Sequence, residues 1–73
     1  MPDTPVNYSE LLEHCRLWVD EGDWGLAVFA LRDTKLAAEC NLTDLLWALH
    51  NGGAAKSEVE DILTQLEHYL AHR

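Results

Sequence analysis

Histidine and cysteine are the residues of this chain whose chemistry extends beyond packing and charge. His68 and His72 stand four positions apart, a spacing that brings two imidazoles to the same side of a helix. A zinc ion needs three or four ligands, and the nearby acids Asp61 and Glu67 do not complete a convincing set. We therefore expect no metal site and no cofactor. The pair is interpreted as exposed histidines near a helix C-terminus, where positive charge is favourable.

The cysteines offer no clear nucleophile either. His14 and Cys15 are adjacent, so on a helix their side chains point in different directions. A Cys-His pair needs hydrogen-bond reach and a third orienting group, and Cys40 with His50 is no more specific. The sequence also contains no phosphate-binding glycine loop and no serine in a nucleophile-elbow context. We expect a protein that is not an enzyme, with both cysteines free in a reducing compartment; a disulfide between them stays the alternative.

Composition limits the possible classes of protein. The chain has 73 residues, 48% of them hydrophobic, and thirteen acids against five lysines and arginines give a formal net charge of −8. Such a charge opposes binding to nucleic-acid phosphates and to anionic membranes. No apolar run approaches the ~20 residues of a membrane span, and the N-terminus does not read as a signal peptide. The expectation is a cytoplasmic protein that binds neither nucleic acid nor membrane.

The first predicted helix begins near Asn7 and ends at Gly22. Asn7 and Glu10 have the spacing of a capping box, and Val6 and Leu11 that of a hydrophobic staple. Gly22 is expected to end the helix in the left-handed conformation. Apolar side chains recur every three or four residues between these points, at Tyr8, Leu11, Leu12, Cys15, Trp18 and Val19.

The second predicted helix runs from Trp24 to about Glu39, with Asp23 as its cap. Its first part, 24–31, has no polar side chain, and two apolar flanks can be drawn on it. One flank holds Trp24, Ala27, Val28, Leu31 and Ala38, and the other holds Leu26, Phe29, Ala30, Ala37 and Cys40. A buried strand over 26–31 is the alternative, but nothing else in the chain could pair with it.

Two more helices complete the predicted fold. Asn41 is expected to cap the third, whose apolar face holds Leu42, Leu45, Leu46 and Leu49, with Trp47 pointing elsewhere. Gly52 and Gly53 end it. Ser57 and Glu60 are read as a second capping box. The last helix then carries an apolar stripe to the C-terminus, formed by Val59, Ile62, Leu63, Leu66, Tyr69 and Leu70.

These patterns predict an all-α fold, a small bundle of about four short antiparallel helices. Residues 1–6 form an N-terminal lead, expected to be flexible, and 7–73 form a single helical domain.

Residues 11–34 resemble a single helical hairpin of the tetratricopeptide-repeat (TPR) family. The turn Gly22-Asp23-Trp24 followed by Ala27 matches the glycine, polar, aromatic and small positions of that repeat. Cys15, Trp18 and Leu31 fit further positions of the repeat, which are small, aromatic and large in that family. The proline that ends the repeat is missing, and no second copy is found in 41–73. The resemblance implies a helical hairpin and a protein-binding role by analogy, and it transfers no binding residues.

Residues 42–66 also read as helix, turn and helix, similar to helix-turn-helix DNA-binding regulators. The start of the second helix there offers Lys56, Ser57, Glu58, Glu60 and Asp61, and its acids would repel phosphates. A DNA-binding regulator is therefore the alternative function.

The leading expectation is a small acidic protein-protein interaction module of bacterial or phage type. It would bind and mask a protein partner, as an inhibitor, anti-activator, antitoxin or chaperone-like adaptor does, and would form a homodimer. Excess apolar surface on a charged small domain is typical of an interface. The partner, possibly basic or itself a nucleic-acid-binding protein, would contact the apolar anchors Trp24, Phe29 and Trp47. Acids near the first turn would steer it, namely Asp20, Glu21 and Asp23.

Overall fold

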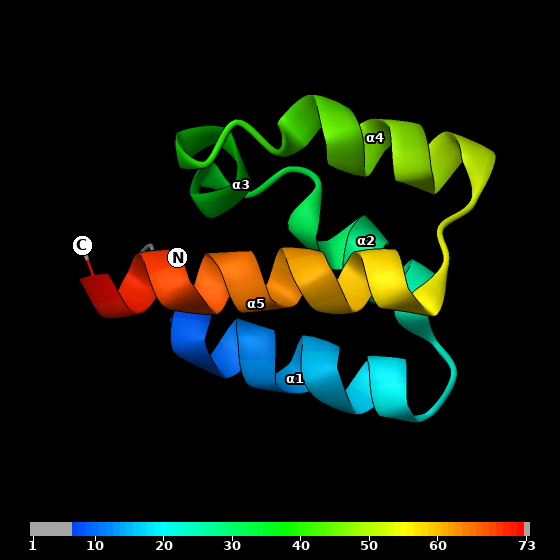
Figure 1. Cartoon of the computed structure of the whole chain (residues 1–73), viewed down its shortest axis with the longest axis horizontal. Helices are drawn as coiled ribbons and strands as arrows, with labels where there is room; N and C mark the ends of the chain where they lie inside the picture. Colours follow the sequence, from blue (N-terminus) through cyan, green and yellow to red (C-terminus); the bar gives the residue numbers. More distant parts are fainter. Residues whose placement is uncertain (1–6, 73) are drawn as a thin grey trace, which may run out of the picture.

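A computed structural model describes residues 7–72 of the chain, and helices joined by short turns make up this part (Figure 1). Five helices follow one another without a strand in the described range: α1 (Tyr8–Asp20), α2 (Trp24–Leu31), α3 (Lys35–Glu39), α4 (Thr43–Gly52) and α5 (Lys56–His72). The predicted all-α bundle is confirmed, and the strand alternative for 26–31 is wrong because α2 covers this segment.

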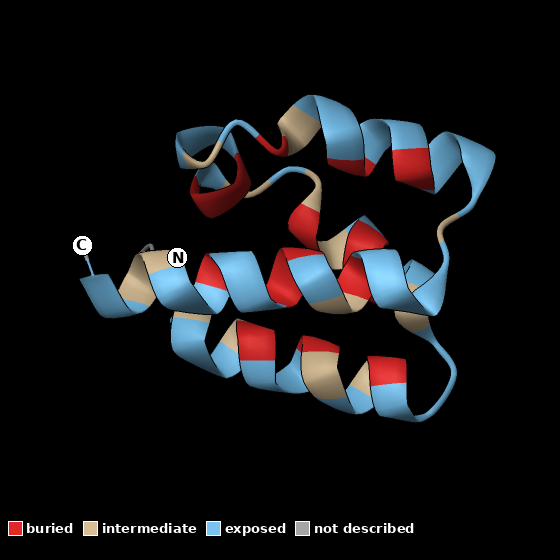
Figure 2. Cartoon of the chain, viewed as in Figure 1, coloured by how far each residue is buried: buried red, intermediate tan, exposed pale blue. Residues whose placement is uncertain are grey.

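The helices pack around α2, which contacts α1, α4 and α5. The long α5 lies beside α1 and runs in the opposite direction, while α4 lies on the other side of the molecule (Figure 1). Figure 2 shows the buried positions on the inward sides of all five helices. Within 7–72 no polar or charged residue is buried, so the core is held by apolar packing alone. It consists of Leu12, Cys15, Val19, Ala27, Val28, Leu31, Leu36, Ala37, Leu42, Leu46, Leu49, Val59, Ile62, Leu63 and Leu66.

The ends of α1 follow the predicted signals. The Asn7 side-chain oxygen accepts a hydrogen bond from the Glu10 backbone N–H at 3.1 Å. At the other end Gly22 has a φ of 93°. Its N–H donates to Val19 O at 3.1 Å, and that of Asp23 donates to Trp18 O at 2.7 Å. This pair of bonds is a Schellman motif, which needs a left-handed residue at Gly22. The predicted Val6–Leu11 staple involves residue 6, which lies outside the described residues.

The predicted helix 24–39 is wrong as one element, because residues 32–34 divide it into α2 and α3. The Thr34 hydroxyl donates to the Leu31 carbonyl at 2.8 Å and accepts from the Ala37 N–H at 3.1 Å. It thus satisfies groups at the end of one helix and the start of the next. The break changes the helical phase. Ala37 is therefore buried and Ala38 is exposed, whereas a continuous helix would have placed Ala38 on the same flank as the buried Val28 and Leu31.

Three predicted caps are corrected. Asn41 does not cap α4: with a φ of 58° it ends α3, and Leu42 occupies the N-cap position. Asp23 stands at the N-cap of α2, but its carboxylate makes no capping hydrogen bond. The Ser57 box is displaced, because the Glu58 carboxylate accepts from the Ala55 N–H at 3.0 Å and α5 already begins at Lys56. Short polar side chains can serve either end of a helix, so their positions in the sequence do not say which end they serve.

Candidate protein-interaction surface

Large apolar side chains remain exposed on α2 and α4. Phe29 is 50% exposed, Leu26 and Leu45 are each 44% exposed, and Trp47 is 37% exposed. Leu17 on α1 is the fifth, at 58%, and stands apart from them in sequence. Exposed aromatic rings on a small acidic domain are the feature that calls for a function.

Helical phase explains why these rings face outward. In α2 the inward side is taken by Ala27, Val28 and Leu31, so Phe29 is turned away from the core. In α4 Leu46 and Leu49 are buried, and Trp47, one step of about 100° after Leu46, lies outside that face. The helices α2 and α4 pack against each other, and one side chain of α2's C-terminal end contacts both outward-facing rings.

Arg32 joins the two rings. Its guanidinium carbon lies 3.9 Å from the centre of the Phe29 ring and 4.6 Å from that of Trp47. The His50 ring centre is 5.6 Å from that of Phe29 and 5.9 Å from that of Trp47. We call Phe29, Arg32, Trp47 and His50 the aromatic cluster. Cation–π contacts of this kind contribute about 0.5–2 kcal/mol each, depending on their exposure.

The guanidinium of Arg32 makes few polar contacts. One terminal nitrogen donates to the Phe29 carbonyl at 2.6 Å, and Asp33 provides a carboxylate oxygen at 3.8 Å. The buried Nε has no hydrogen-bond partner among the described residues. The cluster therefore presents two flat rings around a positive charge whose only ion pair among the described residues is the long one with Asp33.

Trp24 does not belong to the aromatic cluster. It is half-buried against the core, and its indole N–H donates to the Ala54 carbonyl at 2.9 Å. This bond ties the start of α2 to the connection between α4 and α5. Trp24, one of the three predicted anchors, thus packs within the fold, whereas Phe29 and Trp47 remain exposed.

The predicted acidic rim lies at the α1–α2 turn. Asp20, Glu21 and Asp23 are all exposed there. Asp23 precedes Phe29 by six residues, which is about 9 Å along a helix axis. The acids are thus near one end of the exposed face of α2 and do not surround the cluster.

Two cluster residues, Arg32 and His50, were missed by reasoning from the sequence. A signal existed for each: Phe29 and Arg32 are three residues apart, as are Trp47 and His50, and such pairs adjoin on a helix. The contact between the two pairs depends on how α2 meets α4, which spacing alone does not give.

The cysteines and histidines are placed as follows. Cys15 is fully buried, and burial raises the pKa of its thiol from 9.0 to about 11, so it stays protonated at neutral pH. Burial, and secondarily Glu39, raises the pKa of Cys40. Both thiols are free.

The ring centres of His68 and His72 lie 4.2 Å apart. Across residues 7–72 no group of three or more potential ligands could hold a metal ion.

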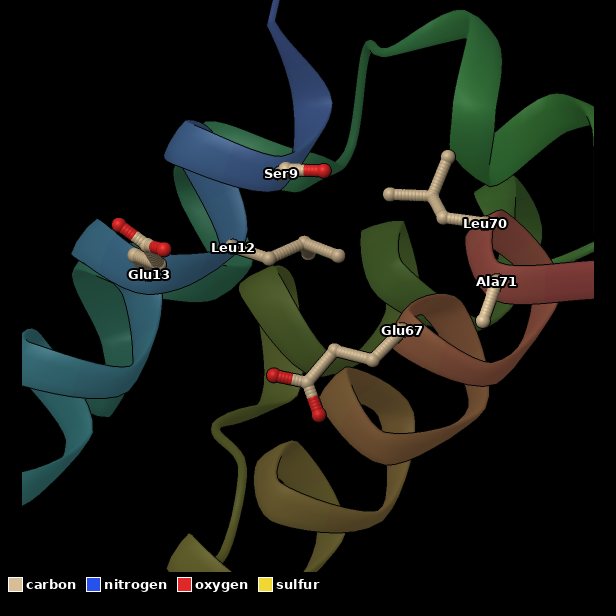
Figure 3. Close-up of a pocket in the computed structure, with 6 residues that line it drawn as sticks. All are labelled: Ser9, Leu12, Glu13, Glu67, Leu70 and Ala71. Carbon is tan, nitrogen blue, oxygen red and sulfur yellow. The ribbon is translucent and has the colours of Figure 1, made fainter.

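A pocket of about 310 Å³ lies between α1 and the end of α5 (Figure 3). Leu12 and Leu70 point into it, and the carboxylates of Glu13 and Glu67 lie at its side. Glu67 is already paired with Arg16 at 2.8 Å. This volume is at the lower limit of small-molecule pockets, about 300–1,000 Å³. The aromatic cluster is therefore the stronger candidate site.

No family model, no curated protein and no solved structure matches the chain. The resemblance of 11–34 to a TPR hairpin stays a prediction, although α1 and α2 do pack against each other. In the described range no helix has the length and apolar character needed to cross a bilayer.

Proposed function

We propose that this chain is a small acidic protein-protein interaction module, which binds and masks a partner protein through the aromatic cluster. The observation that carries the proposal is the pair of exposed rings, Phe29 and Trp47, held together by Arg32. Tryptophan and arginine are enriched among the residues that dominate binding energies. The rings are also prearranged, so little side-chain entropy is lost when a partner covers them.

Charge supports a division of roles on this surface. The cluster supplies flat apolar contact area. The net charge of −8 and the exposed acids Asp20, Glu21 and Asp23 would accelerate the approach of a basic partner. The proposed partner is therefore a protein with an apolar patch beside basic residues.

The proposal includes a homodimer. Domains of this length gain only about 3–5 kcal/mol from their own core, and self-association is a common remedy. Two-fold dimers are the commonest oligomers. Sedimentation equilibrium of the purified chain tests this directly: a dimer mass supports it, and a monomer at all concentrations contradicts it.

The competing function, DNA binding through α4 and α5, has less support. The exposed side of α5 carries Glu58, Asp61 and Glu67. Acids on the helix that would enter the major groove oppose phosphate binding. A salt-sensitive gel shift with the purified protein would favour this alternative over the interaction module.

Trp47→Ala is the test of the binding surface. Because Trp47 lies outside the core, we expect the far-ultraviolet circular dichroism spectrum of the variant to match that of the wild type. The tagged wild type should capture a stoichiometric partner protein from nuclease-treated lysate, and the tagged variant should fail to capture it. Leu17→Ala, which removes another exposed side chain, should capture as wild type does. Trp24→Ala should behave differently and lower stability by about 2 kcal/mol, since a half-buried ring and its hydrogen bond are lost.

Two outcomes would contradict the proposal. Loss of helicity in Trp47→Ala would make this ring structural. Equal capture by wild type and Trp47→Ala would show that the partner does not use the cluster.

A further inference from the structure

A groove separate from the aromatic cluster runs between α4 and α5. We call it the α4–α5 groove; it is lined by Leu45, Leu49, Glu58, Asp61, Ile62 and Gln65 and has a volume of about 220 Å³. The short connection 53–55 turns the chain from α4 into α5 at the right of Figure 1. Because α4 packs on α2, it leaves its Leu45 side uncovered, and this side chain is 44% exposed.

The two walls of the groove have helical spacing. Leu45 and Leu49 are one turn apart on α4. The α5 wall runs from Glu58 to Gln65, about 10 Å along the helix. Leu49 and Ile62 are only 9% and 4% exposed, so they form an apolar floor. A groove about two turns long with an apolar floor matches the way amphipathic helices dock into grooves.

The volume excludes most other occupants. Pockets for drug-sized molecules and cofactors measure about 300–1,000 Å³, more than this groove offers. Its size suits one or two apolar side chains that enter from a partner.

The rim of the groove determines the charge of that partner. Glu58 and Asp61 line it from α5, and none of the six lining residues is basic. The Glu58 carboxylate accepts one bond from the Ala55 N–H. Asp61 makes no hydrogen bond or ion pair with any described residue. A lysine or arginine beside the bound apolar side chains would complement both carboxylates.

A second copy of this chain does not supply such a segment with its exposed leucine on α1. Leu17 is the most exposed large apolar side chain within 7–72, but on its helix it is flanked by Glu13, Asp20 and Glu21. Placing it in the groove would bring carboxylates against Glu58 and Asp61. Like charges opposed in this way disfavour the contact.

We propose that the α4–α5 groove binds an amphipathic helix of another protein, about two turns long, with leucine-like side chains on one face and lysine or arginine at their edge. This inference is independent of the aromatic cluster, since the two surfaces share no residue. It adds to the module a second contact with a defined partner chemistry.

The test is a titration with a designed, fluorescein-labelled peptide of about 14 residues, long enough to form some helix in isolation. Leucines at every third or fourth position are flanked by lysines, and a peptide of the same composition with its leucines scattered is the control. Fluorescence anisotropy measures affinity, and amide chemical-shift changes locate the peptide on ¹⁵N-labelled protein. The variants are Leu45→Ser and Asp61→Lys, with matched controls Leu17→Ser and Glu13→Lys on α1.

We expect saturable binding of the periodic peptide, with shifts centred on 45–49 and 58–65. Leu45→Ser and Asp61→Lys should each weaken it about tenfold or more, while both controls stay within about twofold, as expected when few residues carry the binding energy. Circular dichroism of each variant establishes that it folds. Trp47→Ala should bind the peptide as wild type does, which separates this result from the proposed function.

Three results would overturn the inference. The first is no saturable binding below about 1 mM, roughly −4 kcal/mol. The second is equal weakening by Asp61→Lys and Glu13→Lys, which would reduce the effect to overall charge. The third is a set of shifts centred on Phe29 and Trp47, which would assign the peptide to the aromatic cluster.

Discussion

Two arginines mark two different regions of this molecule. At the α1–α5 contact, Arg16 donates to both carboxylate oxygens of Glu67, at 3.1 and 2.8 Å, and to the Thr64 hydroxyl at 2.9 Å. At the α2–α4 contact, Arg32 lies against two aromatic rings, with the nearest carboxylate oxygen at 3.8 Å. The first arginine makes three hydrogen bonds to side chains of α5, whereas the second makes one hydrogen bond to a backbone carbonyl and lies mainly against aromatic rings.

The difference separates structural surface from candidate binding surface. At the edge of the α1–α5 contact, polar side chains already bond to one another, so a partner would gain little binding energy there. The α2–α4 contact ends in exposed rings around a charge, which a partner can still cover. Three substitution pairs test this comparison, beginning with the largest expected effect.

Leu63→Ala and Leu26→Ala test whether the buried and exposed sides differ in stability. Leu63 on α5 is 0% exposed and Leu26 on α2 is 44% exposed. Removing a buried leucine costs about 2–5 kcal/mol. Since a core of this size supplies about 3–5 kcal/mol, Leu63→Ala should be largely unfolded at 25 °C. Leu26→Ala should lower the free energy of unfolding by less than about 1 kcal/mol. Thermal melts by circular dichroism measure both, and equal losses would make the α2 surface part of the core.

Gly22→Ala and Gly25→Ala test the turn that joins the two regions. Gly22 has a φ of 93°, at which any side chain is strained. Gly22→Ala should therefore lower the free energy of unfolding by about 1–2 kcal/mol. Gly25 lies inside α2 without that φ, and an added methyl group meets nothing within 4 Å. Alanine there should raise stability by about 0.5 kcal/mol. Urea unfolding gives both values, and the same sign for both would disprove the left-handed turn.

Glu67→Gln tests the polar contacts between α1 and α5 through their pH dependence. The hydrogen bond from Arg16 lowers the pKa of Glu67 below its ordinary 4.5. A carboxylate with a depressed folded-state pKa stabilises the fold above its unfolded pKa, and that contribution is lost as pH falls through the folded pKa. Both side chains are more than a third exposed, so we expect less than about 1 kcal/mol at pH 7.

The loss in Glu67→Gln should begin to shrink as the pH falls below about 4.5, and it should disappear once the pH is below the depressed pKa of Glu67 in the folded protein. Glu13→Gln, which removes another exposed acid of the same pocket, is the control for the loss of one negative charge. A Glu67→Gln effect that is constant from neutral to acidic pH would mean that the ion pair does not operate.

The sequence by itself determined the local features of this protein. The positions of α1 and α5, the glycine stops at Gly22 and Gly53, and the apolar stripe from Val59 to Leu70 were all predicted correctly. Each depends on interactions within a few residues: a helical period, a capping side chain, or a backbone angle that glycine adopts readily.

Only the tertiary structure decided which side of 24–31 is buried. Both flanks of this segment are apolar, so periodicity could not choose between Val28 and Phe29. Contacts of α2 with α1, α4 and α5 buried the first and left the second exposed. The same packing bound Trp24 to Ala54 and brought Arg32 against Trp47. These contacts join residues distant in sequence, and local propensity carries no information about how two helices meet.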